Sequence, residues 1–123
     1  MRFSETDDSG GHLIEAYGPE GIRIGGRTYV GGLILSPARI ITGWGPEQIG
    51  DLDAGHLQAL IDLAPELIVL GTGRSQVFPD PAVYGWVLER RIGCEAMDTG
   101  AACRTYNILM AEGRRVVAAL LPW

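Results

Sequence analysis

The sequence contains no lysine; all ten of its basic residues are arginine. This absence excludes a Schiff-base lysine, a Walker-type lysine on a phosphate and a lysine general base. The chain also lacks any run of about 18 apolar residues, the length that crosses a bilayer. Its 15 acidic residues give a net charge of −5, whereas binding to nucleic acid needs a positive face. We therefore expect neither a nucleic-acid partner nor insertion into a membrane.

Histidine and cysteine are scarce, and they form no cluster. His12 and His56 stand alone, and Cys94 and Cys103 have eight residues between them, which fits no C-x-x-C pattern. A metal site needs three or four convergent ligands, which these residues do not supply. No serine lies in a G-x-S-x-G context, and helix capping explains the aspartates at predicted helix starts. The sequence thus predicts no metal and no cofactor, and it favours a non-catalytic protein with two reduced core cysteines.

The length of 123 residues is that of one domain, roughly 100–150 residues. Residues 1–11 are polar and end in Ser9-Gly10-Gly11, so we predict a flexible tail there and a single α/β domain over residues 12–123. The first eight residues are acidic and polar, where a signal peptide is basic and then apolar. We therefore expect a soluble protein that stays in the compartment where it is made, the cytoplasm.

Residues 12–44 carry the pattern of short strands joined by turns. Gly25-Gly26 is typical of a tight hairpin turn, and Gly31-Gly32 inside a strand pattern predicts a bulge or a sharp bend. We expect this N-terminal meander to extend or flank the main sheet. The predicted strands are Leu13–Tyr17, Ile22–Ile24, Thr28–Val30, Leu33–Leu35 and Arg39–Thr42.

After Trp44, predicted helices and strands alternate. Asp53 and Asp80 are placed to cap the first two helices. Gly93 and Gly113 are placed to end the second and third. Such alternation predicts an α/β domain whose sheet is mixed but largely parallel. The predicted helices span about 54–63, 81–92 and 99–112, and the predicted strands are Leu67–Leu70, Cys94–Met97 and Val116–Leu121.

The segment that most suggests a function is Gly71-Thr72-Gly73-Arg74, directly after the apolar strand 67–70. Ligands of open α/β sheets tend to bind at the carboxyl ends of strands. Two glycines let backbone amides approach an anion, and Arg74 could add a charged contact. The segment has neither the spacing of a dinucleotide fingerprint nor that of a P-loop. Two other interpretations stay open: the glycines only let the chain turn out of the sheet, or the loop docks a protein.

Thr99 and Asn107, both in the third predicted helix, complete the candidate site. Asparagine has a poor helix propensity, and Asn107 shares one face of this helix with Cys103 and Met110. A buried amide in such a position needs hydrogen-bond partners. Asn107 therefore either pins a neighbouring loop or lines a pocket with Thr99 and the glycine segment.

Several short motifs together resemble one known family. They are Pro65-Glu66 before four apolar residues, Gly71-Thr72-Gly73, Thr99, Ala102, Tyr106-Asn107, Leu109 and Glu112-Gly113-Arg114. Over about residues 12–122, the chain is similar to the small single-domain family that includes the mitochondrial complex I assembly factor 3 and the adipogenesis-associated domain protein. The resemblance implies a three-layer α/β domain with a central mixed sheet and an attached β-hairpin layer. It implies no enzyme activity, and the eukaryotic members act through protein partners in the assembly of a membrane complex.

Two functions follow from the sequence. The first is a non-catalytic protein-interaction module, assembly-factor-like, with protein partners. The second is a small-ligand or anion-binding domain, which could be an enzyme, centred on Gly71-Thr72-Gly73-Arg74 with Thr99 or Asn107 nearby. We also expect that a homodimer could form through an uncovered sheet edge or the N-terminal hairpin.

Overall fold

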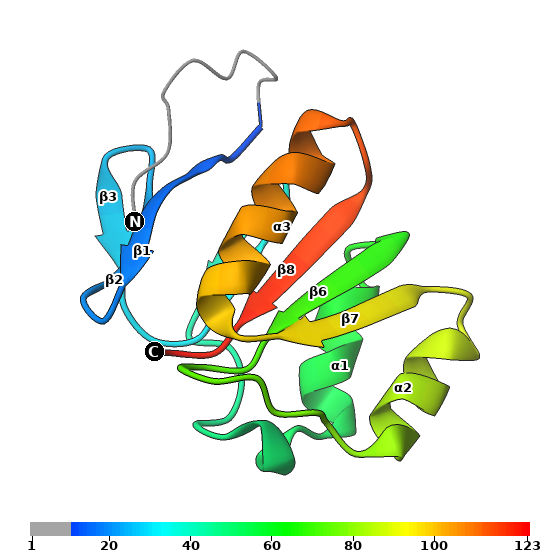
Figure 1. Ribbon diagram of the computed structural model, residues 1–123. Helices are drawn as coiled ribbons and strands as arrows, with labels where there is room; N and C mark the ends of the chain where they lie inside the picture. Colours follow the sequence, from blue (N-terminus) through cyan, green and yellow to red (C-terminus); the bar gives the residue numbers. More distant parts are fainter. Residues whose placement is uncertain (1–10) are drawn as a thin grey trace.

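The computed structural model describes residues 11–123, which form two sheets and three α-helices. A three-stranded antiparallel sheet has the order β1-β2-β3 (Figure 1), and a five-stranded sheet has the order β5-β4-β8-β6-β7. The strands are β1 (Ile14–Gly18), β2 (Gly21–Ile24), β3 (Arg27–Tyr29), β4 (Leu33–Leu35), β5 (Ile40–Thr42), β6 (Leu67–Gly71), β7 (Gly93–Met97) and β8 (Val116–Leu120). The helices are α1 (Ala54–Ile61), α2 (Pro81–Leu88) and α3 (Thr99–Ala111), with a 3-10 turn at Ile49–Asp51.

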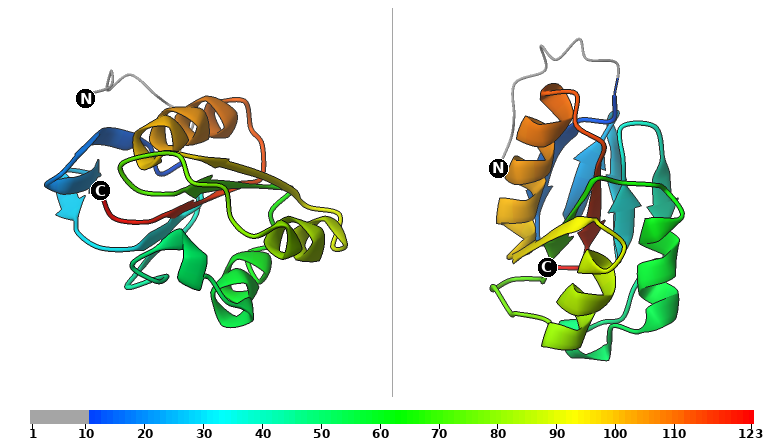
Figure 2. Two further views of the ribbon diagram at one scale, coloured as in Figure 1. Left: turned by 60° about the horizontal axis from the view of Figure 1, so that its bottom comes forward. Right: turned by 90° about the vertical axis from the view of Figure 1, so that its right-hand side faces the viewer.

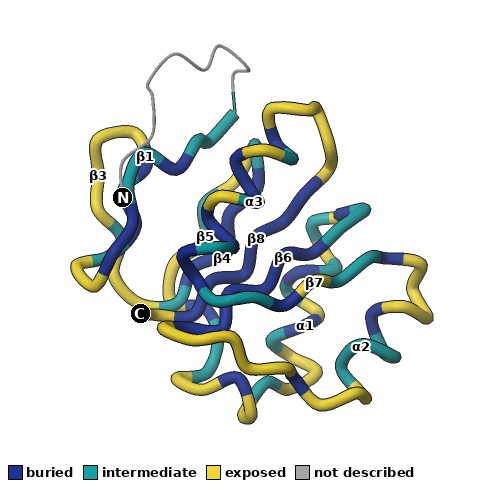
Figure 3. The backbone as a smooth tube through the Cα atoms, in the orientation of Figure 1, coloured by how far each residue is buried: buried dark blue, intermediate teal, exposed yellow. Residues whose placement is uncertain are grey.

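Four strands of the larger sheet run in the same direction. The central strand β8 pairs in parallel with β6, which pairs in parallel with the edge strand β7. β4 runs in the opposite direction between β8 and the other edge strand, β5. The predicted mixed, largely parallel sheet is therefore confirmed. Every residue of β8 is buried, and β6 lies one strand away from the centre (Figure 3).

The larger sheet separates two apolar cores. Val116, Ala118 and Leu120 of β8 belong to one core, and the residue that follows each of them belongs to the other. Side chains of a strand point alternately to its two faces, so an uninterrupted apolar strand is buried on both. The three-stranded sheet and α3 cover one face, and α1 and α2 cover the other (Figure 2). This arrangement is the three-layer architecture expected from the sequence.

Local sequence signals set most of the helix ends. The Oδ1 atoms of Asp53, Asp80 and Asp98 accept hydrogen bonds from backbone amides in the first turns of α1, α2 and α3, at distances of 2.8–2.9 Å. Each aspartate thereby satisfies one of the amides that a helix start leaves without a partner. Gly113, with φ 79°, lies just after α3, as expected for a helix end.

The predicted end of the second helix at Ile92 is wrong. The helix stops at Leu88, and the chain then turns through Arg91, which adopts a left-handed φ of 60°. Gly93 does not cap this helix but begins β7, and its N–H donates to the carbonyl of Glu66 at 3.0 Å. Gly93, which the sequence pattern assigned to the end of the helix, is therefore part of a strand that pairs with β6.

The bend predicted at Gly31-Gly32 carries the chain from the small sheet into the large one. Gly31 has a φ of 90°, and the carbonyl of Gly32 accepts a hydrogen bond of 3.1 Å from the N–H of Trp44. A Cβ atom on Gly32 would lie only 1.6 Å from the carbonyl oxygen of Trp44. The two segments can approach this closely only because Gly32 has no side chain.

The tail predicted over residues 1–11 lies outside the described residues, apart from Gly11. This glycine packs closely: a Cβ atom on it would lie 2.8 Å from Sδ of Met110 and 3.2 Å from Cβ of Pro37. Across residues 11–123, no helix has both the length and the apolar character needed to cross a membrane. The tail, the single domain and the cytoplasmic location stay predictions.

Candidate functional site

The segment Gly71-Thr72-Gly73 leaves β6 at the carboxyl end of the parallel strands, and all three residues are buried. Gly71 is enclosed: a Cβ atom on it would lie 3.0 Å from both Leu120 Cδ2 and Thr99 Oγ1. Gly73 has a φ of 98°, in the left-handed region that favours glycine. Close packing and the turn therefore account for the two glycines.

The backbone amides of this segment are already hydrogen-bonded within the protein. The N–H of Thr72 donates to the carbonyl of Met97 at 2.8 Å, and the N–H of Gly73 donates to Thr99 Oγ1 at 2.9 Å. An anion site of backbone amides needs N–H groups that point at the ligand. Because both amides are used, a ligand would have to displace these bonds. Arg74, the next residue, is exposed.

Thr99 joins the glycine segment to the end of the chain. Its side chain is 1% exposed, and its hydroxyl accepts from Gly73 and donates to the carbonyl of Leu121 at 2.9 Å. The N–H of Thr99 also donates to the carbonyl of Gly73 at 2.8 Å. The structure thus brings Thr99 and the glycine segment together, through bonds that they make with each other.

Replacing Thr99 by valine, which has a similar shape but no hydroxyl, is expected to lower the free energy of unfolding by about 2–3 kcal/mol. The buried N–H of Gly73 and carbonyl of Leu121 would each lose a partner. Urea denaturation measures the change. Thr99→Ser keeps the hydroxyl and should lose only about 1 kcal/mol, from the missing methyl group. Equal losses in the two variants would contradict a role for the hydroxyl.

Asn107 lies away from this segment. It follows Thr99 by eight residues in α3, which places it roughly 12 Å further along the helix. Its Oδ1 accepts from the N–H of Ile14 and its Nδ2 donates to the carbonyl of Ile14, both at 2.9 Å. The buried amide therefore completes the backbone hydrogen bonding of β1 and holds the small sheet against α3. Of the two interpretations of Asn107, the geometry supports the one in which its side chain holds a neighbouring segment in place.

The loop between β6 and α2 is held at several points and exposes two apolar side chains. The hydroxyl of Thr72 accepts from the N–H of Val77 at 3.0 Å and donates to the carbonyl of Ser75 at 2.7 Å. Nε2 of Gln76 donates at 3.0 Å to a backbone carbonyl of the edge strand β7. Val77 is nevertheless 44% exposed and Phe78 71% exposed. Sequence reasoning missed this pair. The feature that could have revealed it is the presence of two adjacent apolar residues outside any segment with helix or strand periodicity.

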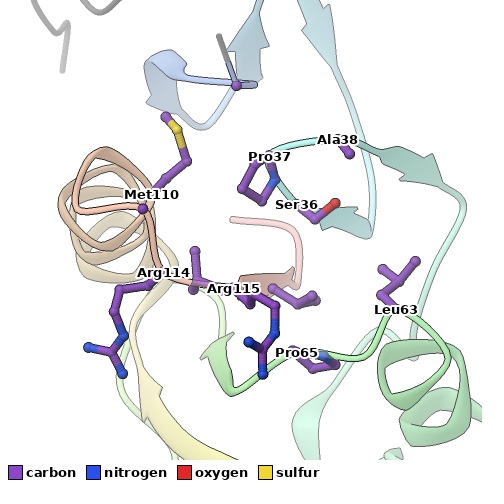
Figure 4. A pocket seen from close by; sticks show the side chains of 12 residues that line it. Ser36, Pro37, Ala38, Leu63, Pro65, Met110, Arg114 and Arg115 are labelled. Atoms are coloured by element: carbon purple, nitrogen blue, oxygen red, sulfur yellow. The ribbon is translucent and has the colours of Figure 1, made fainter. Parts of the chain in front are cut away.

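A cavity of about 540 Å³ lies at the opposite end of the sheet, where β6 and β8 begin (Figure 4). Its walls come from Gly11 before β1, the turn after β4, the segment after α1, the end of α3 and the start of β8. The labelled side chains are Ser36, Pro37, Ala38, Leu63, Pro65, Met110, Arg114 and Arg115. Sequence reasoning missed this cavity because only the fold brings these five parts of the chain together.

The ionisable side chains whose pKa is shifted by burial include two cysteines and one tyrosine packed into the fold. Burial raises the pKa of the Cys94 thiol to about 11 and that of the Cys103 thiol to about 12, so both are protonated at neutral pH. Burial also raises the pKa of Tyr106, whose hydroxyl donates to the carbonyl of His12 at 2.6 Å. Within residues 11–123, no group of three or more histidine, cysteine, aspartate or glutamate residues could hold a metal ion.

Curated relatives of the chain are named NADH dehydrogenase (ubiquinone) 1 alpha subcomplex assembly factor 3. The protein from Xenopus tropicalis is 32% identical over 96% of this chain and 65% of its own length. The protein from Danio rerio is 33% identical over 99% of this chain and 71% of its own length. The chain therefore spans about two thirds of the length of these relatives.

Solved bacterial structures share the fold. A protein from Bordetella parapertussis is 41% identical with a TM-score of 0.85, covering 92% of this chain and 97% of that one. A Bordetella pertussis protein described as an Mth938-like domain is 32% identical with a TM-score of 0.80, covering 99% and 92%. The family described as protein of unknown function (DUF498/DUF598) matches residues 14–121. The chain belongs to this family, which confirms the resemblance inferred from its motifs.

Proposed function

We propose that this chain is a non-catalytic protein-interaction module that assists the assembly of a larger protein complex. The names of the relatives support this role, since they describe assembly factors of an NADH dehydrogenase subcomplex. The chain spans only about two thirds of their length, but the alignments cover nearly all of it. The expected partner is therefore a protein subunit of a complex under assembly.

One observation carries the proposal: a loop tied down by hydrogen bonds exposes Val77 and Phe78. A phenylalanine that is 71% exposed leaves apolar area in water that a partner could cover. The bonds of Thr72 and Gln76 hold the loop before any partner arrives. A loop that is already ordered loses less conformational entropy on binding.

The helix after the loop extends this apolar surface. Leu88, at the end of α2, is 60% exposed. The guanidinium carbon of Arg90 lies 3.5 Å from the centre of the Trp86 ring, and Arg90 also donates to the backbone carbonyl of Trp86 at 2.7 Å. Tryptophan and arginine are the side chains most often found at the energetic centre of protein interfaces. We call Val77, Phe78, Trp86, Leu88 and Arg90 the α2 surface.

The test uses the tagged 123-residue chain expressed in its own host, with cross-linking before purification. The partner of the wild-type chain is identified, and its recovery is compared with that for Phe78→Ser and for Ile108→Ser. Ile108 is the matched control because it is 61% exposed on α3. We expect Phe78→Ser to reduce recovery of the partner about ten-fold or more, and Ile108→Ser to leave it within two-fold.

Two results would contradict the proposal. One is the absence of any reproducible partner; the other is equal recovery by both variants, which would place the contact elsewhere. Both substitutions lie at exposed positions, so circular dichroism should show an unchanged fold.

The ligand- or anion-binding alternative at Gly71-Thr72-Gly73 receives no support from the geometry, because the amides of Thr72 and Gly73 are bonded internally. Association of two copies through a sheet edge stays a prediction. One backbone carbonyl on the outer side of the edge strand β7 already accepts a hydrogen bond from Gln76.

A further inference from the structure

The cavity at the start of β8 has an aliphatic wall that offers few hydrogen bonds. Pro37 and Pro65 line it and have no backbone N–H to donate. Ser36 Oγ, a polar atom of the wall, accepts from the backbone N–H of Arg39 at 3.0 Å. A bound peptide would leave most of its amides and carbonyls without partners against this aliphatic part of the wall, at a cost in free energy. The apolar side chains that line the cavity include Leu63, Met110, Val116 and Val117.

The rim of this cavity carries two arginines although the chain is acidic. Among residues 11–123 its lining includes Arg114 and Arg115 but no aspartate or glutamate, and the ionised Glu66 beside it offsets one of the two positive charges. Arg114 is engaged, since its Nε lies 3.1 Å from Oε1 of Glu66. Arg115 forms no ion pair with any other residue of the range 11–123. Its charge acts on Glu66 only through space, lowering the pKa of that carboxyl, so the N–H groups of its guanidinium stay available to a ligand (Figure 4).

Glu66 holds the backbone of Arg115 in place. Its Oε1 accepts a hydrogen bond of 3.0 Å from the backbone N–H of Arg115. That bond, together with the Arg114 side chain, holds the pKa of Glu66 below its usual value. The carboxylate is thus ionised at neutral pH, and Arg115 is held at its place before β8.

We propose that this cavity binds a medium-chain alkyl carboxylate, with the alkyl chain against the aliphatic wall and the carboxylate on Arg115. The volume of about 540 Å³ falls in the range of small-molecule sites, about 300–1,000 Å³. An alkyl chain needs no hydrogen-bond partner, and a guanidinium binds a carboxylate through two parallel N–H···O bonds. The site lies at the other end of the sheet from the glycine segment, and the inference does not depend on the proposed assembly role.

The test is a titration of the ¹⁵N-labelled 123-residue chain with sodium octanoate, followed by amide chemical shifts. We expect saturable shifts at Gly113, Val116 and Val117. Arg115→Gln should weaken octanoate binding about ten-fold or more, because it removes a charged hydrogen-bond donor. Octan-1-ol, which has the same chain without the charge, should bind the wild-type chain similarly weakly. Ala38→Trp places a large side chain at an exposed part of the lining and should also reduce binding.

The matched control is Arg27→Gln, which removes an exposed arginine on β3 and should change octanoate affinity less than two-fold. Equal affinity for octanoate and octanol, or an unchanged affinity in Arg115→Gln, would overturn the proposal. So would binding that appears only after Asp7 and Asp8 are replaced by asparagine, since the chain's own acidic N-terminal segment would then be the occupant.

Discussion

Replacing Gly32 by alanine is expected to destabilise the protein by more than about 4 kcal/mol, or to prevent folding altogether. The added Cβ would lie 1.6 Å from the backbone oxygen of Trp44, and a backbone atom cannot move aside as a flexible side chain can. Trp44 is itself held, because its indole N–H donates to the carbonyl of His56 at 3.0 Å. Relief of the clash would therefore open the junction where the chain passes between the two sheets. Guanidinium denaturation, or the yield of folded protein, measures the effect.

Gly85→Ala is the matched control for this prediction. Gly85 lies inside α2, where an added Cβ would have no neighbour within 4 Å and φ is not positive. Alanine should stabilise the protein there by about 0.5–1 kcal/mol, because glycine costs a helix conformational entropy. If Gly32→Ala changed the stability by less than about 1 kcal/mol, the close approach of the two segments would be refuted.

Replacing Asn107 by alanine is expected to lower the free energy of unfolding by about 3–5 kcal/mol. Its amide is the partner of both backbone polar groups of Ile14, which is completely buried. Each buried backbone group left without a partner costs about 1–3 kcal/mol, and a small gain in helix propensity offsets little of this. Urea denaturation gives the total change, and hydrogen exchange at the β1 amides reports whether the small sheet loosens first.

The control for this prediction is Ile108→Ala on the same helix. Ile108 is 61% exposed, so its removal should change stability by no more than about 0.5 kcal/mol. A loss of unfolding free energy of less than about 1 kcal/mol in Asn107→Ala would contradict this role. It would mean that water hydrogen-bonds the backbone N–H and carbonyl of Ile14, and that the small sheet does not depend on the Asn107 side chain.

The elements with strong local signals were the ones that sequence reasoning placed well. Aspartate caps, glycine turns and the unbroken apolar run of β8 act over a few residues, and each appears where the sequence predicted it. The error in the predicted end of the second helix concerns a residue whose place is set by a contact with a distant segment. Arg91 occupies the left-handed position after the helix, and Gly93 pairs with β6, a contact between segments far apart in the chain.

The candidate site shows the same division between what local sequence signals predict and what contacts between distant segments decide. The sequence indicated Gly71, Gly73 and Thr99, and the structure brings them together, but the amide of Gly73 is bonded to the Thr99 hydroxyl and the amide of Thr72 to the Met97 carbonyl, so neither is free for an anion. A one-dimensional pattern does not show whether an amide is already bonded to a distant hydroxyl. The exposure of Phe78 and the place of Arg115 at the cavity rim also depend on neighbours from other segments.

By itself, the sequence determined the class of the fold, its family, the order of its elements and the kinds of lysine chemistry it cannot perform. The fold class, the order of the elements and the excluded lysine chemistry follow from composition, from periodicity and from contacts within a few residues, and the family follows from the resemblance of its motifs. Only the tertiary structure decided which polar groups are satisfied inside the protein and which remain available at the surface. That difference has a physical reason: burial and hydrogen-bond partners are set by residues that meet only when the sheet and its two covering layers have packed together.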